Sequence, residues 1–386
     1  VRAVNSKALE LAGITRDTPD PVGGEIERDE NGEPTGILRE NARHLVGEIL
    51  PAKSDEQRVQ ELTNLGKQLS SQGIVAVMDM GNLESEDFYD CYQRAAQSGM
   101  QQEIGLFYIW DLIRKNKSFR WNKRRADPEQ QIHMSGIKLI ADGSIGGRTA
   151  WMYQPYKGST GEYGISVCTD EEIDSAMAFC KENGCQLSFH AMGMRTIDRV
   201  LDRVGDEKPW IKGMPHIRIE HTTDPSENAI RVAASNGIAF CTQSIFLYSE
   251  IESYLNNLGL DWIKRIYPIQ HILDSGVKTA LSTDAPATSW AVPSDPFPNI
   301  KCAVTRYAYD GTDCGRENCI SIETALALYT REAAQIAGFR RLGQLRPGYK
   351  ASFAVLSEDI LQVPADRIDQ VRVVETYING NCVYHR

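Results

Sequence analysis

The sequence predicts an α/β protein of the (β/α)8 TIM-barrel class, in which parallel strands alternate with helices. Two consecutive units show the pattern most clearly: strand Gln186–His190, an amphipathic segment over 196–204, and strand Ile217–His221. Each of these strands ends in a histidine. A third strand candidate, Lys278–Ser282, is followed closely by Asp284. Because the carboxyl ends of barrel strands converge on one mouth, we expect these three side chains to meet there.

Imidazole and carboxylate groups at neighbouring strand ends are a typical ligand set for a divalent cation. A single histidine at a strand end is more often a hydrogen-bonded structural residue, but three ligand types in register favour a shared site. We therefore predict that His190, His221 and Asp284 lie in one metal-sized cluster, with Asp284 also placed to act as a base.

The first 72 residues carry local signals for a helix, a hairpin and a second helix. Residues 3–12 are predicted to form a short helix. Asn31-Gly32 between two alternating segments indicates a β-hairpin. Ser54 followed by Gln57 has the form of a capping box, which predicts that a helix begins there.

From residue 74 the pattern alternates between strands and helices. The strand candidates are Ile74–Met80, Glu103–Trp110, Gly136–Ala141, Gln186–His190, Ile217–His221, Ile238–Gln243 and Lys278–Ser282. The main helix candidates between them are Glu84–Gln97, Asp170–Asn183, Asp224–Ser235 and Trp262–Ser275. These strands are one short of the eight that a closed barrel needs.

The C-terminal quarter first continues the helical pattern and then changes to short strands. Helices are predicted over 299–308 and Ser321–Ala337. The short strands that follow are Ser352–Leu356, Val371–Ile378 and Cys382–Tyr384. We therefore predict a barrel domain over 1–342 and the C-terminal part of a small β-sandwich over 343–386.

Composition narrows the function class. The net charge of −10 argues against a dedicated nucleic-acid-binding protein and against an anionic membrane surface. The basic run over 114–125 is more typical of a solvated helix face or a subunit contact. Nine scattered cysteines without a Cys-x-x-Cys pair indicate reduced thiols and a cytoplasmic enzyme. We expect a small-molecule substrate, a homo-oligomer, and no nucleic-acid or membrane partner.

Several short motifs together carry a family resemblance. They are Val4–Leu9, Gly136–Leu139, Asp142–Gly146, Phe189–Ala191, Arg218–His221, Ser282–Pro286, Leu342–Ala351 and Ile378–Gly380. Through them the chain resembles the metal-dependent amidohydrolase superfamily, and within it the YtcJ-like branch (amidohydrolase family 3). The resemblance extends over essentially the whole chain. It implies a cofactor of one or two divalent metal ions, most often zinc.

The resemblance also implies roles for individual residues. His190 and His221 would be the metal ligands on the fifth and sixth barrel strands, and Asp284 the ligand and base on the eighth. Lys138 matches the place where many relatives carry a carboxylated lysine that bridges two metals. Burial favours the neutral amine that reacts with carbon dioxide. The alternative is an ordinary lysine that pairs with Asp142 or with a substrate group.

One part of the family pattern is missing, because the chain contains no His-x-His pair. The family has that pair at the end of its first barrel strand. Val4–Leu9 already resembles sequence well inside such proteins, so we expect this chain to be part of a longer protein. Without the first strand the sheet would have unpaired edges. We therefore expect residues 1–386 alone to aggregate, and the longer protein to be stable and oligomeric.

The positions of three further residues near strand ends predict roles for them. Arg148, in the glycine-rich segment 142–148 after the fourth barrel strand, is expected to bind an anionic substrate group at the mouth. Asp79 is expected to contact substrate or to support a ligand. Glu220 precedes His221, so alternation predicts that it points to the opposite face with a structural role.

We therefore predict a metal-dependent hydrolase that cleaves a carbon–nitrogen bond other than a peptide, of the non-peptide amide, N-formyl or N-acyl type. Asp284 would act as general acid and base.

A deaminase of the same superfamily is an alternative. Many of those enzymes carry a glutamate soon after the strand-five histidine, whereas this chain has Ala191, Met192, Gly193 and Met194 there. A non-catalytic barrel that has lost its metal is a second alternative. A carboxylate-only glycosidase is a third, with only Asp79 and Asp284 as weak candidates for its two acids.

Overall fold

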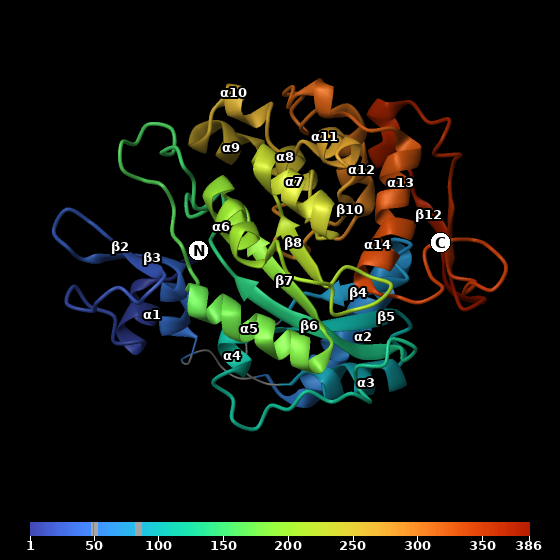
Figure 1. The fold of residues 1–386 in the computed structure, drawn as a ribbon, viewed down its shortest axis with the longest axis horizontal. Helices are drawn as coiled ribbons and strands as arrows, with labels where there is room; N and C mark the ends of the chain where they lie inside the picture. Colours follow the sequence, from blue (N-terminus) through green and yellow to red (C-terminus); the bar gives the residue numbers. More distant parts are fainter. Residues whose placement is uncertain (48, 50–52, 82–86) are drawn as a thin grey trace.

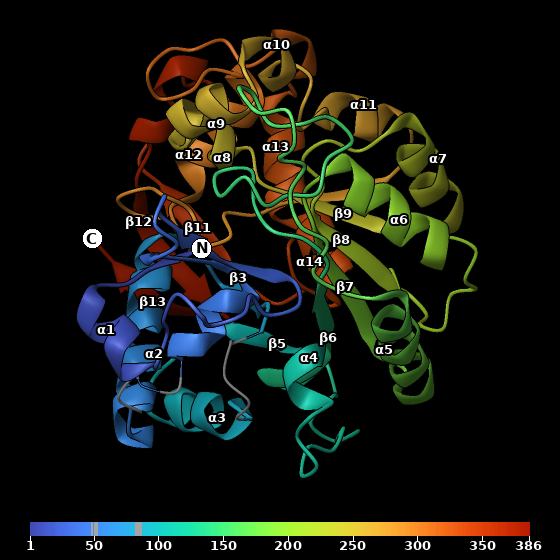
Figure 2. The same cartoon turned by 90° about the vertical axis from the view of Figure 1, so that its left-hand side faces the viewer.

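The computed structural model describes residues 1–47, 49, 53–81 and 87–386. Its centre is a parallel sheet with the strand order β10-β9-β8-β7-β6-β5-β4, curled so that helices cover its outer face (Figures 1 and 2). The strands are β4 Ala76–Asp79, β5 Glu103–Ile109, β6 Ile132–Ile140, β7 Gln186–Ala191, β8 Ile217–His221, β9 Ala239–Thr242 and β10 Lys278–Leu281. All seven predicted strands are confirmed.

Helices that follow the strands enclose the main core. They are α3 Tyr89–Gln97, α5 Asp170–Asn183, α6 Met194–Val204 and α7 Glu227–Asn236. Their apolar faces pack against one face of the sheet, where Ile104, Leu187 and Ile219 are fully buried. The first part of the predicted helix Glu84–Gln97 lies outside the described residues. The remaining helices are short: α4 Trp110–Ile113, α8 Ile245–Ser249, α9 Ile251–Asn257, α10 Leu260–Ile263, α11 Ile269–Asp274 and α12 Pro296–Thr305, with 3-10 turns Asn41–Val46, Arg316–Asn318 and Ala365–Gln370.

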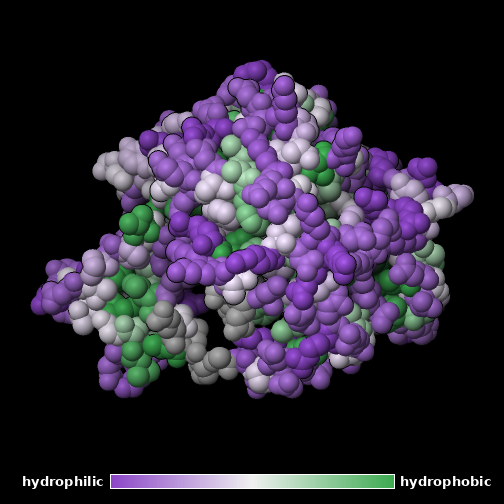
Figure 3. Space-filling view, turned by 60° about the horizontal axis from the view of Figure 1, so that its bottom comes forward, coloured by the Kyte–Doolittle hydropathy of each residue, from purple (hydrophilic) through white to green (hydrophobic). Residues whose placement is uncertain are grey.

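The N-terminal segment forms a small lobe beside the barrel (Figure 1). It contains β1 Arg2–Ala3, α1 Ser6–Leu11, β2 Gly24–Arg28 and β3 Pro34–Glu40. The predicted hairpin is confirmed, with β2 and β3 antiparallel. The helix predicted over 3–12 is wrong at its start, because Arg2–Ala3 pairs with β3 and the side chain of Asn5 caps the helix instead. The lobe exposes apolar side chains, among them Leu11 and Val22 (Figure 3).

Two helices predicted as single elements are interrupted. Ser321–Ala337 divides into α13 Ile322–Tyr329 and α14 Arg331–Ala337, because Thr330 has φ −118° and ψ −86°. Trp262–Ser275 is broken at Tyr267, whose φ is 49° and which precedes a proline. A proline disfavours the helical conformation in the residue before it, so the break is local in origin. The capping box at Ser54 is confirmed and begins α2, Asp55–Ser71.

The C-terminal strands β11 Phe353–Leu356, β12 Val373–Ile378 and β13 Asn381–His385 form one antiparallel sheet. Among the described residues this sheet is a single layer. It is tied to the barrel domain by the Thr376 hydroxyl, which donates to the Ser70 carbonyl at 2.6 Å. The boundary at 342/343 stays a prediction.

The basic run over 114–125 lies mostly in turns after α4, which corrects its expected place on a helix face. None of the described helices is long and apolar enough to span a bilayer.

The start of α5 offers a direct test of the local sequence signals. The Thr169 hydroxyl accepts a hydrogen bond from the Glu172 N–H, and the Glu172 carboxylate accepts one from the Thr169 N–H. Thr169→Ala is expected to lower the free energy of unfolding by about 1 kcal/mol, measured by urea denaturation. Thr330→Ala is the matched control, since Thr330 precedes α14 but caps no N–H. Equal losses in both variants would contradict the capping assignment.

Candidate active site at the carboxyl ends of the strands

The imidazoles of His190 and His221 lie together at the carboxyl ends of β7 and β8. Their ring centroids are 4.4 Å apart, and the rings meet edge to face. In the parallel register Ala191 pairs with His221, so the two histidines reach the same level of the sheet. The predicted meeting of the two histidines at the mouth is confirmed.

The backbone of His221 explains how both histidines face the same space. In the register His190 pairs with Glu220, which places those two side chains on one face of the sheet. Strict alternation would then turn His221 away, but its φ is 76° and the φ of Thr222 is 42°. This left-handed backbone reverses the direction of the side chain. The expectation that Glu220 points to the opposite face is therefore wrong.

A hydrogen-bond network fixes the tautomer of His221. Gln243, just after β9, donates from its amide to the Cys241 carbonyl and to the Ser282 hydroxyl at 2.8 Å. Its side-chain oxygen must therefore face His221 and accept from Nδ1 at 2.9 Å. Burial lowers the pKa of His221 to about 4, so the ring is neutral. Nε2 consequently carries a bare lone pair, and it is buried without a partner in the described chain.

His190 has the complementary tautomer. Its Nε2 lies 2.8 Å from the Gly143 carbonyl, which can only accept, so Nε2 carries the hydrogen. Burial first, and then the neighbouring His221 and Lys138, hold the pKa of His190 well below its usual value. The neutral ring leaves Nδ1 as a lone-pair donor. The side chain is 17% exposed, so it borders the open mouth.

Asp284 follows β10, and its carboxyl group lies near enough to Lys138 and Glu220 for their charges to affect its pKa. Burial raises its pKa to about 6, Lys138 opposes this shift and Glu220 adds to it. Its φ of 53° places it in the left-handed region, a conformation that aspartate tolerates better than most residues. The carboxylate makes no hydrogen bond within the described residues. It is therefore a carboxylate at the mouth whose direction no neighbour fixes.

Lys138 lies on β6, beside Ser188 of β7, with its side chain buried. It acts electrostatically on His190, His221, Glu220 and Asp284, so it belongs to the same cluster. In the described chain it forms no ion pair. In particular it does not pair with Asp142, whose carboxylate instead accepts from the backbone N–H groups of Trp151, Met192 and Gly193.

The three predicted ligands do not form a finished metal site. Across the residues that the structure describes, no three His, Cys, Asp or Glu side chains are grouped closely enough to hold an ion. The expectation of one metal-sized cluster of His190, His221 and Asp284 is wrong in that respect. Hydrogen bonds fix the two histidines, whereas no described residue fixes the Asp284 carboxylate. The donor chemistry nevertheless fits a metal, since two neutral imidazoles each keep one nitrogen lone pair free.

Two predicted substrate residues, Asp79 and Arg148, are held by other protein groups. Asp79 accepts hydrogen bonds from the Tyr92 hydroxyl at 2.7 Å and from the Gly81 N–H, which directs it toward α3 and not toward the histidines. Arg148 is bound by the carboxylate of Glu162 and the carbonyl of Lys157. Both side chains are therefore engaged by the protein itself.

Sequence reasoning missed two residues that shape the site. Gln243 ends a predicted strand, like the histidines, and that position was the available signal. Glu220 lies under the site, held by Arg218 and by the Ser188 hydroxyl at 2.8 Å. Burial pushes the pKa of Glu220 up, but Arg218 and Lys138 outweigh it and the pKa lies below its usual value. The site therefore contains the negative charge of Glu220, which the alternating pattern had placed on the opposite face of the sheet.

Comparison with known proteins gives the family. The model of the amidohydrolase family (Amidohydro_3) matches residues 1–384. The chain belongs to this family. The Bacillus subtilis protein YtcJ, whose name describes an amidohydrolase, is 30% identical over 395 residues, covering 100% of this chain and 72% of that protein. The N-substituted formamide deformylase of Arthrobacter pascens is 26% identical over 406 residues, covering 99% of this chain and 71% of the relative.

Solved structures of low identity share the fold of this amidohydrolase-family chain. An uncharacterized metal-dependent hydrolase from Pyrococcus horikoshii OT3 superposes with a TM-score of 0.72 at 22% identity, over 94% of this chain and 71% of that one. Atrazine chlorohydrolase TrzN from Arthrobacter aurescens TC1, solved with zinc, gives a TM-score of 0.55 at 16% identity, over 85% of this chain and 72% of that chain. The predicted barrel-type α/β fold is confirmed.

Proposed function

We propose that this amidohydrolase-family protein hydrolyses a carbon–nitrogen bond outside peptides, with a divalent metal, most often zinc, as cofactor. One observation carries the proposal: two adjacent neutral histidines, His190 and His221, each have one ring nitrogen committed as a donor and the other left as a lone pair. That arrangement is the one that imidazole ligands of a metal need, because the hydrogen-bonded nitrogen fixes the ring and the other nitrogen coordinates.

The residues of the mouth then have distinct roles. His190 and His221 would hold the metal, together with Asp284 once its carboxylate turns toward them. Lys138, if carboxylated, would supply a further oxygen ligand. When bound, the metal polarises a carbonyl and lowers the pKa of water. Asp284 takes the proton of the attacking water and returns it to the leaving nitrogen.

Two observations favour hydrolysis of an amide bond over deamination: the sequence after β7 and the similarity to one relative. Met192 and Gly193 offer their backbone N–H groups to Asp142, and no acidic side chain stands between His190 and α6. Many deaminases of the superfamily use such an acid to protonate a ring nitrogen. The similarity to an N-substituted formamide deformylase supports N-formyl or N-acyl compounds as the substrate class.

A metal analysis with a substrate panel tests this proposal. The purified full-length protein, loaded with zinc, is expected to release formate or acetate from N-formyl or N-acetyl amines, and chelation should abolish the release. Ammonia release from an amino-purine or amino-pyrimidine, with no release from the amides, would favour the deaminase instead. A full-length protein that binds no metal at micromolar concentration would contradict the proposal and favour a non-catalytic binding module.

Gln243 provides a sharper test of the histidine tautomers. Gln243→Leu removes the oxygen that accepts from His221 Nδ1, so zinc affinity is expected to fall about 10–100-fold. Gln243→Glu keeps an acceptor oxygen and should retain most of the affinity. Isothermal titration with zinc measures both variants. If the leucine variant binds zinc as the parent does, His221 is not oriented in the way proposed.

A further inference from the structure

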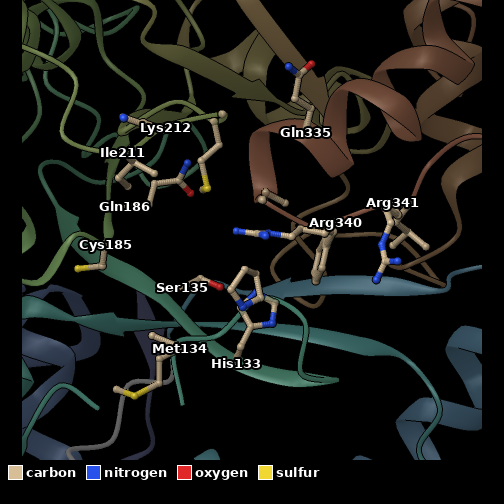
Figure 4. Close-up of a pocket in the computed structure, with 18 of the residues that line it drawn as sticks. His133, Met134, Ser135, Cys185, Gln186, Ile211, Lys212, Gln335, Arg340 and Arg341 are labelled. Carbon is tan, nitrogen blue, oxygen red and sulfur yellow. The ribbon is translucent and has the colours of Figure 1, made fainter. Parts of the chain in front are cut away.

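A cavity lies at the opposite end of the sheet from the histidine pair. It has a volume of about 590 Å³ and is bordered by the first residues of β6 and β7, by the loop over 211–214 and by the end of α14 with the segment that follows it (Figure 4). Nothing in the proposed reaction uses this space. Its size is in the range of sites for small organic molecules.

The wall of this amino-terminal cavity contains polar atoms without partners in the described chain. Gln186 is fully buried, and its amide nitrogen donates to the Pro215 carbonyl at 2.7 Å and to the Ile336 carbonyl at 3.0 Å. Both hydrogens are thereby used, and its oxygen is left as an unpaired acceptor. Such a buried acceptor is costly unless a donor reaches it.

His133 and Ser135 extend this polar wall. His133 is 3% exposed and lies edge-on to Phe339. Burial lowers its pKa to about 4, so the ring is neutral, and Nδ1 has no partner. The hydroxyl oxygen of Ser135 is also unpaired. These unpaired acceptors are buried directly behind the inner wall, and hydroxyl or amino groups of a ligand would match them.

The rim of the cavity has the opposite character. Four basic side chains border it: Lys212, Arg331, Arg340 and Arg341. Two carboxylates offset them in part, since Glu332 pairs with Arg331 at 2.6 Å and Glu129 pairs with Arg341 at 2.8 Å. Glu129 is 3.8 Å from Arg340, whose guanidinium points into the cavity in Figure 4. The rim keeps an excess of positive charge that a dianion would match better than a single carboxylate.

We propose that this cavity binds a phosphate monoester of a small hydroxyl- or amino-bearing compound, separately from the active site. The phosphate would contact Arg340 and Lys212 at the rim, and the hydroxyl or amino groups would donate toward Gln186 and His133. Phe339 supplies an apolar face for the body of the ligand. The proposal does not depend on the reaction assigned to the other end of the sheet.

Isothermal titration of the full chain tests the proposal with three probes: glucose 6-phosphate, adenosine 5′-monophosphate and inorganic phosphate. At least one of the two esters is expected to bind, and to bind at least about tenfold more tightly than inorganic phosphate, because only the esters carry donors for the inner wall. Arg340→Gln should weaken ester binding on the order of tenfold. Arg231→Gln, the same charge change on the exposed surface of α7, should leave it unchanged.

Further variants separate the two ends of the sheet. Ser135→Ala is expected to weaken binding of the ester without changing binding of inorganic phosphate. Asp284→Asn and metal chelation should leave ester binding intact. The proposal is overturned if neither ester binds, if Arg340→Gln and Arg231→Gln have equal effects, or if chelation abolishes binding, since that last result would assign the ester to the metal site.

Discussion

Replacing Asp284 by asparagine is expected to lower kcat of the metal-loaded protein about 10²–10⁴-fold while leaving the fold intact. Asparagine adopts positive φ as readily as aspartate, so the backbone at φ 53° is not disturbed. The carboxamide keeps the shape but cannot accept the proton of the attacking water. Initial rates on an N-formyl substrate, corrected for zinc content, measure the effect.

Asp79→Asn is the matched control for that experiment. It makes the same chemical change at another strand end, but Asp79 is hydrogen-bonded to Tyr92 on α3. Its rate per folded molecule should stay within about twofold of the parent rate. If the two variants lose activity equally, Asp284 has no special role as a base. If Asp284→Asn retains full activity, the proton must be transferred by another group.

Replacing Arg218 by methionine is expected to lower the free energy of unfolding by about 3–5 kcal/mol. Arg218 and Glu220 form an ion pair at 2.5 Å, with side chains only 7% and 5% exposed. The substitution leaves the Glu220 carboxylate buried beneath the active site with the Ser188 hydroxyl as its remaining hydrogen-bond donor. Most of the loss is the cost of that uncompensated charge, and urea denaturation measures it.

A second substitution tests this explanation. The Arg218→Met/Glu220→Gln double variant removes the carboxylate that has lost its arginine, so at least half of the lost stability should return. Arg203→Met, which breaks the exposed pair with Asp174, should lower the free energy of unfolding far less than Arg218→Met does. A double variant that is less stable than Arg218→Met alone would show that packing, and not the uncompensated charge, causes the loss.

The sequence by itself determined the elements whose cause is local. Alternating and apolar runs identified all seven strands, because a strand in a parallel sheet must bury both of its faces. The capping box at Ser54 located the start of α2, since the orphan N–H groups of a helix need acceptors from nearby residues. His190 and His221 were found because strand ends in a parallel sheet share one edge.

Tertiary structure alone decided the orientations within the site. The positive φ of His221 reverses the direction of its side chain, so Glu220, His190 and His221 lie on the same face of the sheet. A strictly alternating pattern places Glu220 and His221 on opposite faces. Gln243 reaches His221 only because β8 and β9 are neighbours, although 22 residues separate the two positions. Asp79 and Arg148 were assigned from proximity to strand ends, yet Tyr92 and Glu162 hold them. Which partner a polar side chain finds depends on elements distant in sequence, and only the folded chain brings those elements together.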